Sequence, residues 1–183
     1  MGDAVVRWKI EPLKRSRRGL DERLLLAVPR AARVLGRILA GRRAGSRIRR
    51  ALITRVIRTG FAANNRLDYD ALFVFYERGI EVRLTGGGAR VDLDPVYWGY
   101  EGLRKVNEDW RAGFDQFQFE PCEVIDPGGD RFGLLVDFHG QTSGMVTRQR
   151  SGFVIILRDG LAMRQDFYWD SEDAVEALMT PAR

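Results

Sequence analysis

The chain has 183 residues, of which 45% are apolar and 10% aromatic, and its formal net charge is +5. This length and composition exclude wholesale disorder and favour one domain of ordinary size with an appendage. Cys122 is the one cysteine, which excludes an internal disulfide framework. Arginines interrupt every apolar run before it reaches membrane-spanning length, and no secretory cleavage site is evident, so we expect a cytoplasmic protein.

The charge divides the chain into two parts. Residues 1–60 hold 17 Lys and Arg against 4 Asp and Glu, a balance of +13, whereas residues 61–183 hold 13 against 21, a balance of −8. We therefore predict a basic helical extension over residues 1–45 and an acidic domain over residues 46–183. We predict that the extension is separable, so that deletion of residues 1–45 should leave a folded, pocket-bearing domain that starts near Ser46. If the extension instead seals the sheet, deletion should cause aggregation.

Residues 1–60 contain two stretches with the apolar periodicity of a helix. Apolar residues from Val28 to Leu39 recur at helical spacing, and Gly41 marks the end of that helix. Ser46 is placed to cap a second helix, which is long and apolar enough to be the first helix of the domain. No strand signal precedes Gly60.

The middle of the chain combines two further helices with a strand. Asp68 lies where an N-cap is needed for a short helix through Tyr76, and a strand-like alternation follows. Residues 85–89 are glycine-rich but lack the Lys-Ser/Thr pair of a phosphate-binding loop, so we interpret them as a flexible connection. A third helix then carries Leu103 and Trp110 on one face.

The last third of the chain alternates like a set of strands. Extended segments are predicted over residues 117–125, 132–138, 146–157 and 161–169, followed by a terminal helix over residues 172–179. Asp159-Gly160 is a strong two-residue hairpin signal. The order predicts an α+β fold, in which a curved antiparallel sheet wraps around three helices and leaves a cavity at its open end.

Five short segments of turn, cap and core residues follow one another along the chain: residues 65–72, 99–103, 123–126, 157–160 and 172–178. In their order and spacing they resemble those of the SnoaL-like, nuclear-transport-factor-2-like superfamily over about residues 47–179. The resemblance implies a cone with a pocket for a small apolar organic molecule, and a homodimer formed through the outer sheet face, which carries Leu135, Ile155 or Leu157. One departure is Gly79, where many relatives have an acidic residue.

The resemblance also implies a catalytic carboxylate, because catalytic relatives place one buried acid in the pocket. Asp166 is the nearest positional match. Strand alternation puts Arg164, Asp166 and Tyr168 on one face and Gln165 and Phe167 on the other. If the apolar set faces the cavity, Asp166 points outward and pairs with Arg164 or with a neighbouring strand.

His139 is the second catalytic candidate, because it is the one histidine of the chain. It shares a strand face with Asp137, opposite the apolar set, and this phase favours an exposed or interfacial side chain. A pair of Cys122 with His139 is formally available, although a buried, inert thiol is the alternative. One histidine excludes a histidine-rich metal site, and no acidic cluster has metal-ligand spacing, so we expect neither metal nor cofactor.

Aromatic residues are the candidates for a ligand-binding wall, with core packing as the alternative interpretation. They are Tyr76, Trp98, Trp110, Phe114 and Tyr168.

Two classes of function stay open at this point. One is a cofactor-independent isomerase, cyclase or hydrolase that uses a pocket carboxylate. The other is a non-catalytic ligand-binding or dimeric scaffold domain. Residues 1–60 could bind nucleic acid or an anionic membrane, but the favoured interpretation is that their apolar face docks on the domain or on a partner subunit. The substrate cannot be read from the sequence.

Overall fold

A computed structural model describes residues 4–13, 17–85 and 93–180 of the chain. The glycine-rich segment expected to be a flexible connection lies largely outside these residues, at 86–92. In chain order the elements are β1 (Val6–Lys9), α1 (Leu20–Ala27), α2 (Pro29–Ala40), α3 (Arg47–Arg66), α4 (Tyr69–Phe73), β2 (Tyr76–Thr85), β3 (Val96–Trp98), α5 (Gly99–Gly113), β4 (Gln116–Asp126), β5 (Arg131–Thr142), β6 (Met145–Arg158), β7 (Leu161–Tyr168) and α6 (Ser171–Met179).

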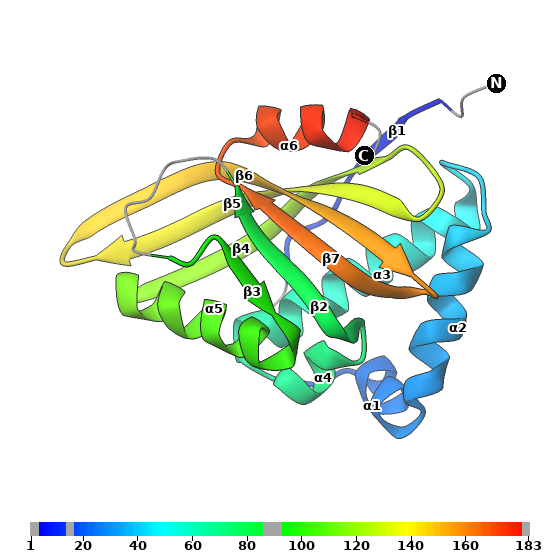
Figure 1. The fold of residues 1–183 in the computed structure, drawn as a ribbon, viewed down its shortest axis with the longest axis horizontal. Coiled ribbons are helices and arrows are strands. Elements are labelled where there is room, and N and C mark those ends of the chain that lie inside the picture. The colour runs from blue at the N-terminus through cyan, green and yellow to red at the C-terminus, as the bar shows by residue number, and fades with distance from the viewer. Residues whose placement is uncertain (1–3, 14–16, 86–92, 181–183) are drawn as a thin grey trace.

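The strands form one open, seven-stranded sheet in the order β1-β4-β5-β6-β7-β2-β3. It curves around α3, α4 and α5, while α6 lies on the opposite, outer side (Figure 1). The predicted α+β architecture is confirmed. The sheet is mixed rather than wholly antiparallel, because β2 runs parallel to β7. That pairing joins two strands that α5 and the β4–β6 meander separate in the chain. The alternation of apolar and polar residues along either strand does not reveal it.

Helix starts follow the caps that the sequence predicts. Ser46 accepts a hydrogen bond from the Arg49 amide at 3.2 Å and begins α3. Asp68 accepts one from the Ala71 amide at 3.3 Å and begins α4. These side chains satisfy amide groups that the first turn of a helix leaves unpaired.

Aromatic rings cluster around Trp110 in the core of the molecule. The Trp110 ring, on the buried face of α5, lies 5.0 to 5.9 Å from six other rings (centroid to centroid). Such pairs contribute about 0.5–1.5 kcal/mol each beyond the area they bury. The six rings belong to Phe114, Phe117, Phe119, Phe138, Phe167 and Trp169.

The outer face of the sheet is covered in part by α6. Gly133 and Gly152 permit this close packing, because a Cβ atom on either would lie within 2.6 Å of an α6 side chain. Leu135 is buried with Leu178 of α6. Ile155 and Leu157, which we expected on this face, lie on the cavity side instead. Covering Leu135 therefore needs no second subunit, and the homodimer stays a prediction.

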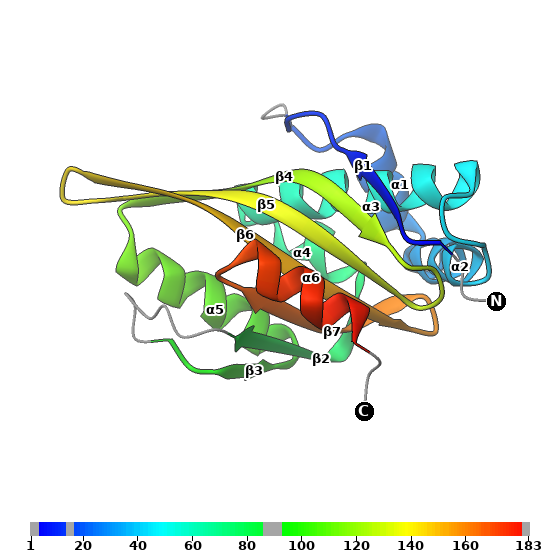
Figure 2. The same ribbon diagram turned by 90° about the horizontal axis from the view of Figure 1, so that it is seen from above.

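The described part of residues 1–45, which we call the N-terminal segment, contacts the rest of the fold at several points. Residues 6–9 form β1, an edge strand that pairs antiparallel with β4 (Figure 2), a correction to the expectation of no strand before Gly60. The α2 helix packs on the turn between β6 and β7, where Gly36 meets the backbone of Gly160. Arginines of the segment also meet acids of the body, as Arg18 does with Asp68 at 2.6 Å.

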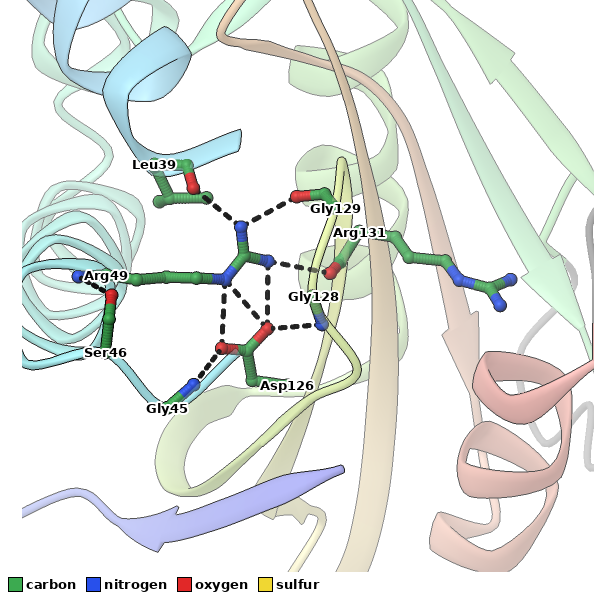
Figure 3. Close-up of polar contacts among 8 residues, drawn as sticks. All are labelled: Leu39, Gly45, Ser46, Arg49, Asp126, Gly128, Gly129 and Arg131. Atoms are coloured by element: carbon green, nitrogen blue, oxygen red, sulfur yellow. Dashed lines mark hydrogen bonds and ion pairs between the residues drawn. The ribbon is translucent and has the colours of Figure 1, made fainter. Parts of the chain in front are cut away.

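A buried ion pair joins the N-terminal segment, α3 and the sheet (Figure 3). Neither the Arg49 nor the Asp126 side chain is exposed, and Arg49 Nη2 lies 2.8 Å from Asp126 Oδ1. Arg49 Nη1 donates to the Leu39 carbonyl and to the Gly129 carbonyl, both at 2.7 Å. Asp126 in turn accepts from the Gly45 amide at 3.3 Å. Because every donor and acceptor named here has a partner, the pair fixes the positions of three separate chain segments.

We predict that Asp126→Asn lowers the free energy of unfolding by about 3–5 kcal/mol, because it leaves the buried Arg49 guanidinium without a counter-charge. Chemical denaturation measures the change. The exposed pair of Asp137 with Arg150 supplies the control, and Asp137→Asn should change stability by less than about 1 kcal/mol. Equal effects of the two substitutions would contradict the role assigned to the buried pair.

The domain boundary at residue 45 stays a prediction, and the contacts of β1 and α2 favour the sealing alternative. Deletion of residues 1–45 would uncover the β4 edge and the surface beneath α2, so we expect aggregation or an expanded hydrodynamic radius by size-exclusion chromatography. Deletion of residues 1–5, which precede β1, is the control and should leave the radius unchanged. A monodisperse, fully folded chain beginning at Ser46 would establish the arm as separable.

Candidate functional site

An interior cavity of about 110 Å³ lies between the curved sheet and the helices. Side chains from α3, α5 and the central strands form most of its wall, which includes the aromatic rings of Trp110, Phe119, Phe153 and Phe167. Pockets for drug-sized ligands are roughly 300–1,000 Å³. The cavity is therefore matched to a much smaller molecule.

The α2 helix closes one side of this cavity. Ala32, Gly36 and Leu39 line it together with Gly160 of the β6–β7 turn. A Cβ atom at Gly36 would lie 1.9 Å from the Gly160 carbonyl oxygen, so the helix can approach this closely only with glycine at that position. The predicted N-terminal extension thus contributes wall residues to the candidate site.

The polar groups of the cavity are uncharged. The Tyr76 hydroxyl donates to Gln165 Oε1 at 2.9 Å, which leaves the Gln165 amide nitrogen as a donor. Asn107 uses its side-chain nitrogen to bond the Leu103 carbonyl at 2.8 Å, which leaves its oxygen as an acceptor. Burial raises the pKa of Tyr76 above the ordinary tyrosine value, so its hydroxyl keeps its proton near neutral pH.

None of the described residues that line the cavity carries a carboxylate or an imidazole. Over the same described ranges, His, Cys, Asp and Glu form no group of three or more that could hold a metal ion. Among the described residues that line the cavity, Tyr76 is thus the one with a titratable side chain.

Asp166 lies on the outer face of the sheet, away from the cavity. Asp166 is 3% exposed, and its carboxylate is paired in bidentate fashion with Arg164, with Nε–Oδ1 and Nη2–Oδ2 distances of 2.8 Å. This hydrogen bonding raises the pKa of Arg164. The neighbouring Gln165 and Phe167 point into the cavity instead. The acid is therefore held as the partner of an arginine, outside the interior cavity.

His139 also lies on the outer face, and its side chain is half exposed. Its Nε2 is 3.9 Å from Glu120 Oε2. Cys122 does not pair with it in the sheet, because His139 is in register with Gln118 and Cys122 lies at a bulge further along β4. Burial raises the pKa of the Cys122 thiol, which disfavours the thiolate.

Two of the five expected ligand-binding residues, Tyr76 and Trp110, line the cavity. Phe114 packs behind Trp110, and Trp98 is 63% exposed on β3. Tyr168 lies on the outer face beside Asp166 and α6. The sequence analysis did not identify Gln165 or Asn107. Strand alternation did place Gln165 on the apolar face of its strand, and a single carboxamide among apolar residues is the signal that could have identified it.

Comparison with protein-family models gave no match, and comparison with curated proteins gave none. Solved structures do match. TerC, co-crystallised with polyporic acid, is 17% identical, with a TM-score of 0.58 over 69% of this chain and 97% of TerC. A nuclear-transport-factor-2-like protein of unknown function from Burkholderia pseudomallei is 14% identical, with a TM-score of 0.57 over 69% of this chain and 96% of that one.

A putative SnoaL-like polyketide cyclase from a Jannaschia species is 15% identical, with a TM-score of 0.52 over 70% of this chain and 92% of that one. The chain therefore has the SnoaL-like, nuclear-transport-factor-2-like fold, and the expected resemblance is confirmed at the level of fold. Within the described ranges, no helix combines the length and hydropathy needed to cross a bilayer.

We predict that Gly36→Ala lifts α2 from the β6–β7 turn, because its methyl group cannot be accommodated beside Gly160. The free energy of unfolding should fall by about 1–3 kcal/mol, and binding of an apolar fluorescent dye should rise. Gly41→Ala is the control, since the nearest atom to its methyl group would lie 3.5 Å away, an ordinary contact. Equal dye binding by both variants would show that α2 does not close the cavity.

Proposed function

We propose that this protein binds a small, uncharged organic molecule inside its cone and performs no general acid–base chemistry there. The observation that carries the proposal is the composition of the described cavity wall, which is apolar and aromatic apart from neutral hydroxyl and carboxamide groups. A charged ligand would lose its hydration without gaining a counter-ion, at a cost of several kcal/mol.

The ligand class follows from the groups that are left unpaired. The Gln165 amide nitrogen offers a donor and the Asn107 oxygen offers an acceptor, so a hydroxyl on a compact apolar body fits either group, and a carbonyl fits the Gln165 donor. The volume of about 110 Å³ is in the range of a single small ring. TerC, which shares the fold, was co-crystallised with polyporic acid, and this supports an organic molecule as the class of ligand.

The isomerase, cyclase or hydrolase alternative has less support. It needs a carboxylate aimed into the cavity, and Asp166 is instead engaged by Arg164 on the outer face. The putative polyketide cyclase among the matching structures shares the fold with this chain, and a shared fold does not carry the reaction across.

Matched neutral and charged probes test the proposal. Benzaldehyde and benzoate have nearly the same size, and we expect benzaldehyde, but not benzoate, to raise the thermal unfolding midpoint of the full chain. Gln165→Leu should weaken benzaldehyde binding by about five- to tenfold, because it removes the donor while it keeps the volume of the side chain. Asp166→Asn is the control and should leave probe binding unchanged.

The pH profile provides a second criterion. Because the pKa of Tyr76 is raised by burial and its hydroxyl stays protonated, benzaldehyde affinity should be flat between about pH 5 and pH 9. Preferential binding of benzoate, or an affinity that follows a carboxylate titration, would overturn the proposal. A retained ligand, identified by native mass spectrometry, would name the natural molecule.

A further inference from the structure

Aliphatic side chains stay exposed on the N-terminal helices after those helices have docked. Six large aliphatic residues between positions 20 and 48 are 40 to 84% exposed, whereas α2 docks through other residues, Ala32, Gly36 and Leu39. An isolated exposed aliphatic residue is ordinary, but six within one short segment are not. They are Leu20, Leu24, Val28, Val34, Ile38 and Ile48.

Arginines accompany these aliphatic residues. Residues 20–50 contain nine arginines against two acids, Asp21 and Glu22, a balance of +7. Glu22 is buried and bonded to Arg66 at 2.6 Å, so it does not offset the exposed charge. Six arginines are exposed and form no ion pair with a described residue: Arg23, Arg30, Arg33, Arg42, Arg43 and Arg47.

Helical phase places both kinds of residue on the same outward faces. On α2, Val34 follows Arg30 by four residues and Ile38 follows it by eight, opposite the docking residues, and all three are exposed. On α1, Leu20 and Leu24 repeat at the same spacing and both are exposed, while Leu25 is buried. The outward faces of α1 and α2 are therefore basic and apolar together.

We propose that the outward faces of α1 and α2, which we call the basic-apolar face, bind the surface of an anionic lipid bilayer. The arginines would meet lipid phosphates while the aliphatic side chains enter the boundary between headgroups and acyl chains. This inference concerns a surface distinct from the cavity and does not depend on the proposed ligand.

The residue types favour a bilayer over two other anionic or apolar partners. Single-stranded nucleic acid is bound through arginines together with stacking aromatics, and residues 20–50 contain no Phe, Tyr or Trp. The cores of protein interfaces are likewise enriched in aromatic residues and poor in charge. A bilayer has both an acyl boundary for branched aliphatic chains and phosphates for the arginines between them.

Vesicle co-sedimentation of the full chain tests the proposal. We expect binding to vesicles of phosphatidylcholine with phosphatidylglycerol, and binding at least about tenfold weaker to phosphatidylcholine alone or after addition of salt. Arg30→Gln should weaken binding to the anionic vesicles about fivefold, which is about 1 kcal/mol for one arginine near the membrane surface. Arg148→Gln, on the exposed part of β6, is the matched charge control and should have no effect.

The combined variant Leu24→Ser and Val34→Ser tests insertion separately from charge. It should weaken binding about tenfold or more while the thermal midpoint of the protein is kept, since both side chains are exposed. Met145→Ser with Val146→Ser is the matched control, because both residues are 61% exposed far from α1 and α2, and it should bind like the unmodified chain.

Three results would overturn the proposal. The first is a failure to bind either kind of vesicle. The second is binding to RNA or DNA that depends on Arg30 but not on Leu24 and Val34. The third is a self-associated state that only the Leu24 and Val34 variant dissociates, since this would assign the face to a second copy of the chain.

Discussion

The structure depends on one buried ion pair, Arg49 with Asp126. A charge without solvent is tolerated only where its donors and acceptors are satisfied, and Arg49 meets this condition by bonding carbonyls of α2 and of the β4–β5 turn. Asp126 meets it by accepting amide hydrogens from Gly45 and Gly128. Each segment is thus held in place by the hydrogen bonds that it makes to the buried charges. The N-terminal residues become part of the cone because α3 carries an arginine that only they and the sheet can satisfy together.

This arrangement sets the chemistry of the interior. With α2 in place, the cavity has apolar walls on several sides and offers a ligand carboxamide and hydroxyl groups alone, over the part of the chain that the structure describes. The titratable pairs lie elsewhere, as Arg164 and Asp166 do on the outer face. Charged side chains thus lie where ion-pair partners or water can stabilise them, and the described cavity wall has none. The same α2 helix has one face toward the cavity and one toward solvent, so a single element contributes to both proposed binding surfaces.

Local signals predicted the features that short stretches of chain determine. The caps Ser46 and Asp68 and the Asp159-Gly160 hairpin follow from residue chemistry at single turns. Strand alternation indicated that Gln165 and Asp166 lie on opposite faces of the sheet. Features that depend on distant partners were missed: β1 has four residues, and its pairing with β4 has no local signature. Arg49 was one among many arginines of a basic segment, and its burial is decided by Asp126, which lies far along the chain.

The contacts of Arg49, β1 and α2 imply that the N-terminal segment and the cone unfold as one unit. Native-state hydrogen exchange measured over a series of denaturant concentrations tests it most directly, because it resolves the opening free energy of each element. We predict that amides of α2 and β1 exchange with the same free energy and denaturant dependence as those of β5 and β6. Exchange of α2 and β1 through a smaller opening that leaves β5 and β6 protected would show instead that the segment is an independent appendage.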